Sequence, residues 1–309
     1  MADIVISEFM DEGVIAAAFA QRDVLYDPQL VDAPERLRAA LQQARALIVR
    51  NRTQVRADLL AAGPNLRVIG RLGVGLDNID LDACAARNIR VCPATGANDD
   101  SVAEYVITAA LVLLRGAWHA SAQVAAGEWP RMAMVGSEVA GKRLGLVGYG
   151  AIARKTAARG RALGMKISAT DPYIRADDPC WGDTRRMPLN ELLAEADVLS
   201  LHVPLTQATR YLIDAAAIAR MKKGAILINA ARGGVVEEAA LVAALAAGHL
   251  AGAALDVFET EPLCALAGKR FSGIDNLLLT PHIAGVTHES NRRVSRVTTN
   301  NVLAILDHP

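Results

Sequence analysis

The feature that most constrains the fold is an alternation, along the whole chain, of short apolar or β-branched runs with longer stretches suited to helices. This pattern is typical of βαβ units, in which a helix connects two parallel strands. It predicts an α/β fold with parallel sheets. Five strands are expected in the first third of the chain: Ile4–Ser7, Val24–Tyr26, Ala46–Val49, Arg67–Ile69 and Arg90–Cys92.

A second series of six strands is expected at Arg143–Val147, Lys166–Thr170, Val198–Leu201, Ala225–Asn229, Gly252–Leu255 and Leu277–Thr280. Six strands with helical connections suit a complete doubly wound sheet. Between the two series, a long helix-compatible stretch runs from Asn98 to Glu128. It begins with the capping-type pair Asp100 and Ser101, and Glu104 follows three residues after Ser101.

The chain length of 309 residues is about twice the ~150 residues typical of one domain, so two domains are expected. Residues 287–306 predict a last helix. If this helix packs back against the first strand series, the first domain is discontinuous. It then comprises residues 1–97 with 287–309, and residues 98–286 form the second domain.

Composition excludes several classes of function. Basic and acidic residues number 33 each, and aromatic residues make up 4%, so neither a basic field nor a stacking platform favours nucleic acid as a partner. The longest apolar stretch, Tyr105–Leu114, is about half the ~20 residues of a membrane span. Asp3 and Glu8 are atypical of a secretory signal, which favours a cytoplasmic location. The four cysteines lack metal-site spacing, so no metal is expected.

A glycine-rich segment follows the expected strand that ends at Val147. Gly148 permits a tight turn, Gly150 lets a pyrophosphate approach the backbone N–H groups at a helix start, and the small Ala153 allows close packing of helix on strand. Asp171 ends the next strand, 21 residues beyond Gly150, where a carboxylate can accept from a ribose 2′-hydroxyl and repel a 2′-phosphate. NAD is therefore predicted over NADP, although Arg175 lies nearby.

Three reactive side chains follow later strands, at the edge where open α/β sheets bind their ligands. Arg232 can bind a substrate carboxylate and polarise a keto oxygen. His282 can exchange a proton with that oxygen, and Glu261 can orient the imidazole. Asp256 is expected near the nicotinamide end. Together these residues predict the reduction of a 2-keto acid and its reverse.

The chain resembles the D-isomer-specific 2-hydroxyacid dehydrogenases through the motifs GYGAIA, ARGGVV, DVFETEP and TPHIAG, which occur in that order. The resemblance extends to the first domain through GRLGVGLDNID and NDDSVAE, and the former pattern is closest to the phosphoglycerate dehydrogenase branch. The family implies a flavodoxin-like substrate-binding domain, a Rossmann domain that binds NAD, and a homodimer. Tyr105 stands where many relatives carry a histidine, and the sequence does not indicate its role.

By this resemblance Arg232, Glu261 and His282 are the catalytic set, with His282 as the proton donor. Val74 and Gly75 are expected to meet the substrate carboxylate through their backbone. The residues expected to bind the cofactor are Gly148, Gly150, Ala151, Ile152, Asp171, Val203, Ala230, Ala231, Asp256 and Gly285.

Three arginines bear on the substrate. If Arg50, Arg71 and Arg131 converge, with Arg131 possibly supplied by a partner subunit, they would hold a second anionic group on carbon 3. Each could instead be a surface ion-pair residue. The expected substrate is a D-2-hydroxy acid of the 3-phosphoglycerate or 3-sulfolactate type.

Two alternatives remain open, namely a dehydrogenase of small neutral acids (a hydroxypyruvate or glyoxylate reductase) and a non-enzymatic, NAD-sensing protein like the corepressors that share the fold. The chain stops at His308 and Pro309, so the serine-binding regulatory module of the longer relatives is expected to be absent. Because reduction needs a protonated histidine and oxidation a neutral one, oxidation should accelerate and reduction slow as pH rises.

Overall fold

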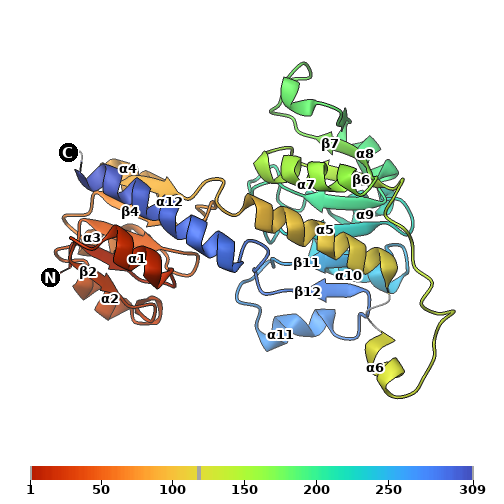
Figure 1. The fold of residues 1–309 in the computed structure, drawn as a ribbon, viewed down its shortest axis with the longest axis horizontal. Helices are drawn as coiled ribbons and strands as arrows, with labels where there is room; N and C mark the ends of the chain where they lie inside the picture. Colours follow the sequence, from red (N-terminus) through yellow and green to blue (C-terminus); the bar gives the residue numbers. More distant parts are fainter. Residues whose placement is uncertain (1, 117–119, 308–309) are drawn as a thin grey trace. The chain divides into compact units, whose positions relative to one another are not determined.

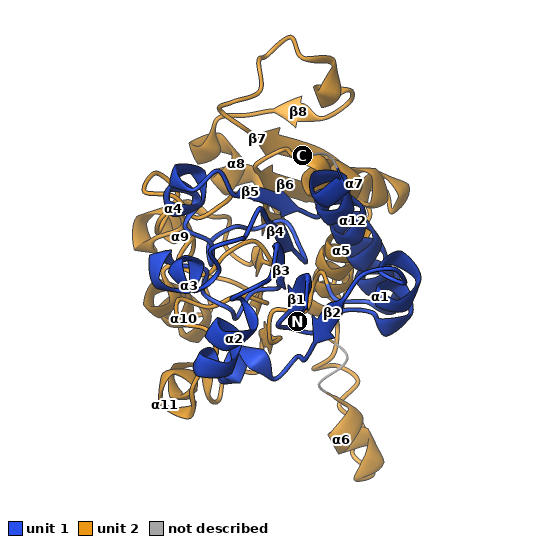
Figure 2. Cartoon of the chain, turned by 90° about the vertical axis from the view of Figure 1, so that its left-hand side faces the viewer, with its two compact units in different colours: residues 1–98, 286–309 blue, residues 99–285 orange. Residues whose placement is uncertain are grey.

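A computed structural model describes residues 2–116 and 120–307 (Figure 1). The chain divides into two compact units, which Figure 2 shows in different colours: unit 1 comprises residues 1–98 and 286–309, and unit 2 comprises residues 99–285. Each division lies one residue from the boundary expected from the sequence. The fold is α/β with parallel sheets, which confirms the predicted class.

Unit 1 is built on a five-stranded sheet of β1 (Ile4–Ile6), β2 (Val24–Tyr26), β3 (Ala46–Val49), β4 (Val68–Arg71) and β5 (Arg90–Pro93). Its strand order is β2-β1-β3-β4-β5 and all pairs are parallel, which is the flavodoxin-like order. The helices of this unit are α1 (Glu12–Ala18), η1 (Leu30–Asp32), α2 (Pro34–Ala40), α3 (Ala57–Ala62), α4 (Leu81–Ala86) and α12 (His288–Asp307).

The buried strands of unit 1 separate two apolar clusters, because successive residues of a strand face opposite sides of the sheet. Ile4 and Ile6 of β1 pack in the cluster that α1 and α12 cover, whereas Val5 packs in the cluster covered by α2, α3 and α4. Val294 and Val302 of α12 are buried in the first cluster. The C-terminal helix thus completes the unit that the N-terminal strands begin (Figure 1).

Unit 2 is built on a seven-stranded parallel sheet with the order β12-β11-β10-β9-β6-β7-β8. The strands are β6 (Arg143–Val147), β7 (Lys166–Thr170), β8 (Arg185–Arg186), β9 (Val198–Leu201), β10 (Ile226–Asn229), β11 (Gly252–Leu255) and β12 (Leu277–Leu279). The helices are α5 (Asp99–Arg115), α6 (Ser121–Ala125), α7 (Ala151–Ala162), η3 (Pro179–Trp181), α8 (Leu189–Glu195), α9 (Ala215–Arg220), α10 (Glu238–Ala246), α11 (Ala265–Gly268) and η4 (Lys269–Phe271).

The sheet of unit 2 follows the Rossmann strand order, with β12 added beyond β11. The helices α5 and α7 supply buried residues to one apolar cluster, and α8, α9 and α10 supply those of the other, so the sheet is covered on both faces. The expected six strands were one too few. The two-residue strand β8 is exposed and basic, and it pairs with β7 without any apolar run that a sequence pattern could detect.

The expectation of one helix from residue 98 to 128 is wrong. The helix α5 ends at Arg115, and Gly116 follows with φ of +61°, a conformation that ends helices. The short α6 begins only at Ser121, and residues 117–119 lie outside the described part of the chain. The expected capping start at Asp100 and Ser101, with Glu104 following, also differs from the structure, because α5 begins at Asp99 and so contains both residues. The carboxylates of Asp100 and Glu104 pair with Arg159 of α7, and Asp100 pairs with Lys155 as well.

None of the described helices is long and apolar enough to cross a membrane.

Candidate active site

The glycine-rich loop of unit 2 lies where the strand order of the sheet reverses, between β6 and β9. Gly148 has φ of +87°, and a Cβ there would lie 2.6 Å from the carbonyl oxygen of His202, so the turn requires glycine. Gly150 precedes α7, and a Cβ at Gly150 would meet no atom within 4 Å. The backbone N–H groups at the start of α7 are therefore approachable by a phosphate.

Asp171 is tied to this loop by its own hydrogen bonds. Its Oδ2 accepts from the backbone N–H of Tyr149 at 2.9 Å, and its Oδ1 accepts from that of Tyr173 at 2.9 Å. A carboxylate has about four acceptor sites, so capacity for a ribose hydroxyl remains. Val203, after β9, lies beside Gly148, and Ala151 and Ile152 begin α7. These residues fit an adenine dinucleotide, and the structure brings them to one edge of the sheet.

The loop after β10 carries Arg232 and is shaped by Asn229, the last residue of that strand. The side-chain oxygen of Asn229 accepts from the Ala231 N–H at 3.1 Å, and its Nδ2 donates to the Arg232 carbonyl at 2.9 Å. A Cβ at Gly233 would lie 1.7 Å from the carbonyl oxygen of Phe258, so this loop packs backbone to backbone against the segment before Glu261. Sequence reasoning missed Asn229, which only its place at a strand end could have indicated.

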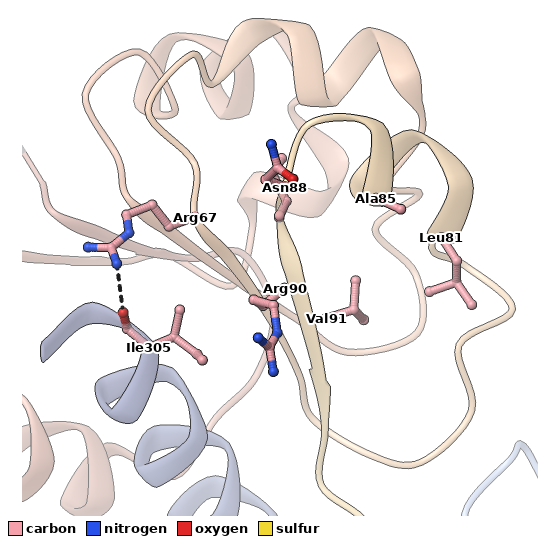
Figure 3. A pocket seen from close by; sticks show the side chains of 8 residues that line it. Arg67, Leu81, Ala85, Asn88, Arg90, Val91 and Ile305 are labelled. Carbon is pink, nitrogen blue, oxygen red and sulfur yellow. Dashed lines mark hydrogen bonds between the residues drawn. The ribbon is translucent and has the colours of Figure 1, made fainter. Parts of the chain in front are cut away.

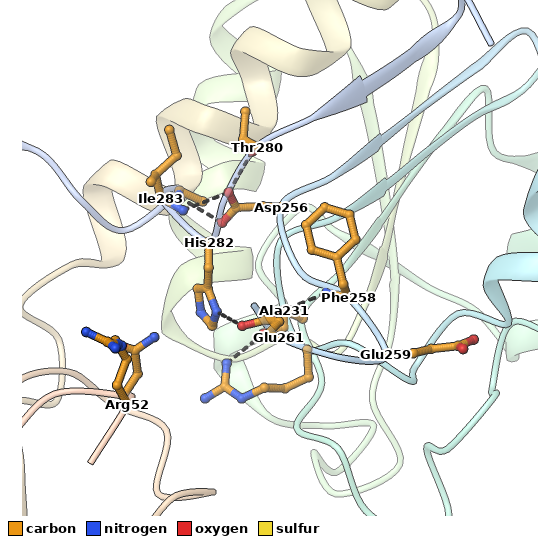
Figure 4. Close-up of polar contacts among 12 residues, drawn as sticks. Arg52, Ala231, Asp256, Phe258, Glu259, Glu261, Thr280, His282 and Ile283 are labelled. Atoms are coloured by element: carbon orange, nitrogen blue, oxygen red, sulfur yellow. Dashed lines mark hydrogen bonds and ion pairs between the residues drawn. The ribbon is translucent and has the colours of Figure 1, made fainter. Parts of the chain in front are cut away.

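Glu261 and His282 form the central pair of the site (Figure 4). The Nδ1 of His282 lies 2.7 Å from Oε2 of Glu261, and Oε1 accepts from the Phe258 N–H at 3.0 Å. Burial raises the pKa of Glu261, but the hydrogen bonds from His282 and Phe258, with the charges of His282 and Arg232, outweigh burial and lower it overall. The ionised carboxylate only accepts, so the shared hydrogen lies on Nδ1, and Nε2 is the nitrogen for proton transfer.

The loop that carries His282 is held by Asp256. His282 has φ of +57°, an uncommon conformation for a residue other than glycine, which the surroundings must maintain. The Asp256 carboxylate is buried and accepts from the Thr280 hydroxyl at 2.6 Å and from the N–H groups of Ile283 and Ala284 at 2.8 Å each (Figure 4). Asp256 therefore sets the backbone on both sides of His282, and Gly285 follows directly.

In unit 1, two of the predicted arginines end neighbouring strands. Val49 pairs with Arg71 in the register of β3 and β4, and Arg50 follows Val49. Arg71 folds over the next turn, since a Cβ at Gly73 would lie 1.9 Å from its Nη1, and Nη1 donates to the Leu72 carbonyl at 2.6 Å. The predicted loop residues Val74, which is exposed, and Gly75, which is half-buried, follow this turn.

The segment that begins at Arg50 is organised by Glu8, a residue that the sequence reasoning did not place in the site. The buried Glu8 carboxylate accepts from the backbone N–H groups of Arg50, Asn51, Arg52 and Thr53 at 2.8, 3.2, 3.0 and 2.9 Å. Burial raises its pKa, but these backbone hydrogen bonds outweigh burial and lower it overall. An acidic residue just past the apolar strand β1 is the only signal that could have indicated it.

Arg50 is largely enclosed. Burial lowers the pKa of its guanidinium, and Nη2 donates to the side-chain oxygen of Asn291 on α12 at 2.9 Å. Arg131 belongs to unit 2, in the exposed segment between α6 and β6. Arg50 and Arg71 thus stand at adjacent strand ends of one unit, while Arg131 belongs to the other.

A hollow on unit 1 lies away from Arg50 and Arg71. It is lined by Arg67, Leu81, Ala85, Asn88, Ile89, Arg90, Val91 and Ile305 (Figure 3). Arg67 precedes β4 and Arg90 begins β5, so the hollow lies at the amino ends of the strands, whereas Arg50 and Arg71 lie at the carboxyl ends. Among the described residues, no group of three His, Cys, Asp or Glu side chains could hold a metal ion.

Comparison with known proteins agrees with this geometry. Residues 107–284 match the family described as D-isomer specific 2-hydroxyacid dehydrogenase, NAD binding domain. The chain is 54% identical over 303 residues to a protein of Chromohalobacter salexigens named (S)-sulfolactate dehydrogenase, with coverage of 98% of this chain and 97% of that protein. It is 38% identical over 301 residues to a D-3-phosphoglycerate dehydrogenase of Mycobacterium leprae, with coverage of 97% of this chain and 56% of that protein.

Among solved structures, the chain is similar to D-lactate dehydrogenase from Aquifex aeolicus complexed with NAD and lactic acid. The TM-score is 0.84 at 29% identity, and the match covers 98% of this chain and 95% of that one. The predicted family resemblance, its phosphoglycerate dehydrogenase-like character and the predicted cofactor NAD are confirmed by these comparisons.

Proposed function

This chain belongs to the D-isomer-specific 2-hydroxyacid dehydrogenases, and within that family we propose that it acts on a hydroxy acid with a second anionic group on carbon 3. It is an NAD-dependent oxidoreductase that interconverts a 2-hydroxy acid and a 2-keto acid. The proposed substrate is 3-sulfolactate, and 3-phosphoglycerate is the second candidate.

The observation that carries the proposal is that Arg50 and Arg71 stand at the carboxyl ends of adjacent strands in unit 1. Arg71 lies against the turn that leads to Val74 and Gly75, the loop proposed to meet the substrate carboxylate. Arginine binds sulfonate and phosphate oxygens through several parallel hydrogen bonds. Two such groups beside a carboxylate-binding loop suit a substrate with two anions better than lactate.

The name of the similar protein from Chromohalobacter salexigens supports a sulfonate and is compatible with the D series. In 3-sulfolactate the sulfur on carbon 3 gives the CH2SO3 group priority over the carboxylate, whereas in lactate the carboxylate outranks the methyl group. The label S in sulfolactate therefore denotes the same spatial arrangement as in D-lactate. A site that selects D-2-hydroxy acids would accept (S)-3-sulfolactate in the same orientation.

We assign the proton transfer to His282. In the oxidation direction, the C2 hydroxyl proton passes to Nε2 of His282, the C2–H bond breaks with its electron pair leaving as hydride, and a C=O bond forms. Glu261 holds the imidazole through Nδ1 and stabilises its charged form. Arg232 binds the substrate carboxylate and polarises the C2 oxygen.

NAD supplies the acceptor for the hydride. The residues proposed to hold it are those at the edge of the unit 2 sheet: Gly148, Gly150, Ala151, Ile152, Asp171, Val203, Ala230, Ala231, Asp256 and Gly285. Asp256 acts there through the loop that it fixes, because its carboxylate is buried and already accepts three hydrogen bonds.

The proposal is tested by following NADH formation with the D and L forms of 3-sulfolactate, 3-phosphoglycerate, glycerate, lactate and malate, and the keto acids in reverse. We expect turnover of the D-configured sulfonate or phosphate acid at a kcat/KM at least about tenfold above that of glycerate and lactate, as one well-placed charge-assisted contact provides. Turnover of neutral acids alone would contradict the second-anion site and establish the alternative, a small-acid reductase.

A variant pair separates the arginine site from general damage. Arg71→Ala should raise KM for the doubly charged acid about 10- to 100-fold and KM for D-lactate clearly less, because both acids use the loop that Arg71 lies against but only the former also loses a charge-assisted contact. Arg36→Ala is the control, since Arg36 is an exposed arginine of unit 1 that pairs with Asp27. Equal losses on both acids would exclude Arg71 as a second-anion residue.

The NAD-sensing alternative gives a different result in the same assay. A protein of that class would bind NADH, as measured by quenching of tryptophan fluorescence, yet turn over no acid in either direction. That outcome would overturn the proposed substrate and the proton-transfer role of His282 together.

We further propose that the chain acts as a homodimer through the exposed segment that contains Arg131. Trp129, Met132 and Val135 in this segment are 75 to 82% exposed, which is unusual for large apolar side chains. Sedimentation should give a dimer.

If Arg131 reaches the partner's site, mixing inactive Arg131→Ala and His282→Ala subunits should restore about a quarter of wild-type activity, since half of the dimers have one intact site. No recovery after confirmed exchange would place Arg131 outside the site.

The proposed location is the cytoplasm. All four cysteines are free thiols, as is usual for a reducing compartment. Fractionation of cells that express the tagged chain tests this, and recovery outside the cytoplasm would contradict it.

A further inference from the structure

Tyr105 on α5 is connected to the loop of His282 by hydrogen bonds that the proposed mechanism does not use. Its hydroxyl lies 2.6 Å from Oγ1 of Thr280, and Oγ1 of Thr280 donates to Oδ1 of Asp256 at 2.6 Å. Asp256 in turn accepts from the N–H groups of Ile283 and Ala284. The chain of contacts therefore ends on the two residues that directly follow His282.

The donor in each of these hydrogen bonds can be assigned from the single hydrogen that each hydroxyl carries. A threonine hydroxyl has one hydrogen, and the one on Thr280 is given to the Asp256 carboxylate. The Tyr105 hydroxyl must then be the donor to Thr280. Burial, the largest influence, raises the pKa of Tyr105, so the phenol keeps its proton throughout the physiological range.

Tyr105 lies on a helix that is firmly packed within unit 2. The helix α5 packs its buried residues Val106 and Ile107 in the core of unit 2, and its first turns are bound to α7 through Asp100 and Glu104, which pair with Arg159. The Tyr105 hydroxyl is therefore held in place by a well-packed helix. The His282 loop, in contrast, is held in a conformation with φ of +57°, which needs outside support.

We propose that Tyr105 and Thr280 are positioning residues, which fix Asp256 and through it the backbone that aims His282 at the substrate. This inference rests on the proposed function of His282. Neither residue exchanges a proton with the substrate. Each acts by keeping Asp256 in the orientation that receives both backbone N–H groups, and chains of hydrogen bonds that polarise one another strengthen each link.

The test removes one hydroxyl at a time. Tyr105→Phe and Thr280→Val delete a donor while keeping most of the side-chain volume, and Thr280→Ser keeps the hydroxyl. Tyr26→Phe is the matched control, because Tyr26 also donates its hydroxyl within the chain, to the Met10 carbonyl at 3.2 Å, but lies in unit 1.

We expect kcat to fall about tenfold in Tyr105→Phe and Thr280→Val, with KM for the acid changed less than about twofold, because a small misplacement of a catalytic group lowers the rate of the chemical step. The midpoint of the kcat–pH profile for oxidation should also move to lower pH, because a less firmly positioned His282 ring forms a weaker hydrogen bond with Glu261, and the protonated imidazole is then stabilised less. Thr280→Ser and Tyr26→Phe should match the wild type in kcat and in the midpoint of the kcat–pH profile. A loss of activity that comes only from unfolding would leave this midpoint unchanged and would overturn the proposal.

Hydrogen–deuterium exchange gives a readout that does not depend on turnover. The peptide that contains the Ile283 and Ala284 amides should exchange about tenfold faster in Tyr105→Phe than in the wild type or in Tyr26→Phe, since exchange reports the opening of these hydrogen bonds. Unchanged exchange would overturn the positioning role. If the wild type turned over no acid but exchange still increased, the proposed function would fail while the coupling between Tyr105 and the loop stood.

Discussion

At the carboxyl edge of the unit 1 sheet, Glu8 accepts hydrogen bonds from four successive backbone N–H groups, whereas at that of unit 2 Glu261 gives one oxygen to a backbone N–H and the other to the His282 ring. Both carboxylates are ionised groups whose pKa is lowered by what they bind. In unit 1 the acid organises the backbone of residues 50–53, which includes Arg50, a residue proposed to bind substrate. In unit 2 the acid holds the imidazole that is proposed to exchange a proton. The same functional group is thus used in two ways at the edges of two similar parallel sheets.

His282→Ala removes the side chain that Glu261 holds in unit 2. We expect kcat to fall about 10³- to 10⁴-fold, toward the upper end of what a general acid or base contributes, while NADH binding stays within about twofold. Stopped-flow turnover and NADH fluorescence titration measure the two quantities. His288→Ala, at an exposed histidine that begins α12, should retain full activity. A near-normal kcat in His282→Ala would assign the chemistry of unit 2 to another residue.

Glu261→Gln should have the next largest effect. It removes the charge that stabilises the protonated imidazole but keeps an oxygen for the Phe258 N–H, so kcat for reduction should fall about 10- to 100-fold. The midpoint of the kcat–pH profile for oxidation should shift to lower pH. A pH profile that is superimposable on that of the wild type would show that Glu261, like Glu8, serves only the backbone.

Glu8→Gln tests the opposite side of the comparison. The amide keeps one acceptor oxygen, but its NH2 group would face backbone N–H donors, so the free energy of unfolding should fall by about 2 to 3 kcal/mol. Urea denaturation measures this change. KM for the doubly charged acid should rise more than kcat falls, because the segment 50–53 carries Arg50. A fall in kcat with KM unchanged would mean that unit 1 also takes part in the chemical step.

The acid dependence of stability gives a smaller effect with a definite sign. The pKa of Glu8 in the folded protein lies below its ordinary value of 4.5, so its ionised form contributes stability above that pH, and the contribution is lost as pH falls through the folded pKa. Wild-type stability should therefore fall faster than that of Glu8→Gln below about pH 4.5. Parallel curves would exclude Glu8 as a source of acid lability, since carboxylates such as Asp3 and Asp197 are common to both proteins.

The motifs predicted much of unit 2 because their chemistry is local. Gly148 has the positive φ expected of a tight turn, and the apolar runs at residues 143–147 and 198–201 form largely buried strands, as predicted. The prediction was wrong at the start of α5, where a local pattern resembles a helix cap but the side chains form other contacts. Asp100 and Ser101, with Glu104 three residues later, were predicted to begin a capped helix, but α5 begins at Asp99, and the carboxylates of Asp100 and Glu104 pair with Arg159 of α7.

Local patterns along the chain were enough to predict the α/β class, the family, the cofactor and the order in which the proposed reactive side chains occur. No such pattern predicted that Glu8 accepts hydrogen bonds from the backbone of residues 50–53, or that the hydroxyl of Tyr105 contacts that of Thr280, 175 positions away. The physical reason is that hydrogen bonds act over about 3 Å, and strand order decides which distant residues come within that range. Periodicity along a chain encodes which face a residue takes, but it does not encode its neighbour across the sheet.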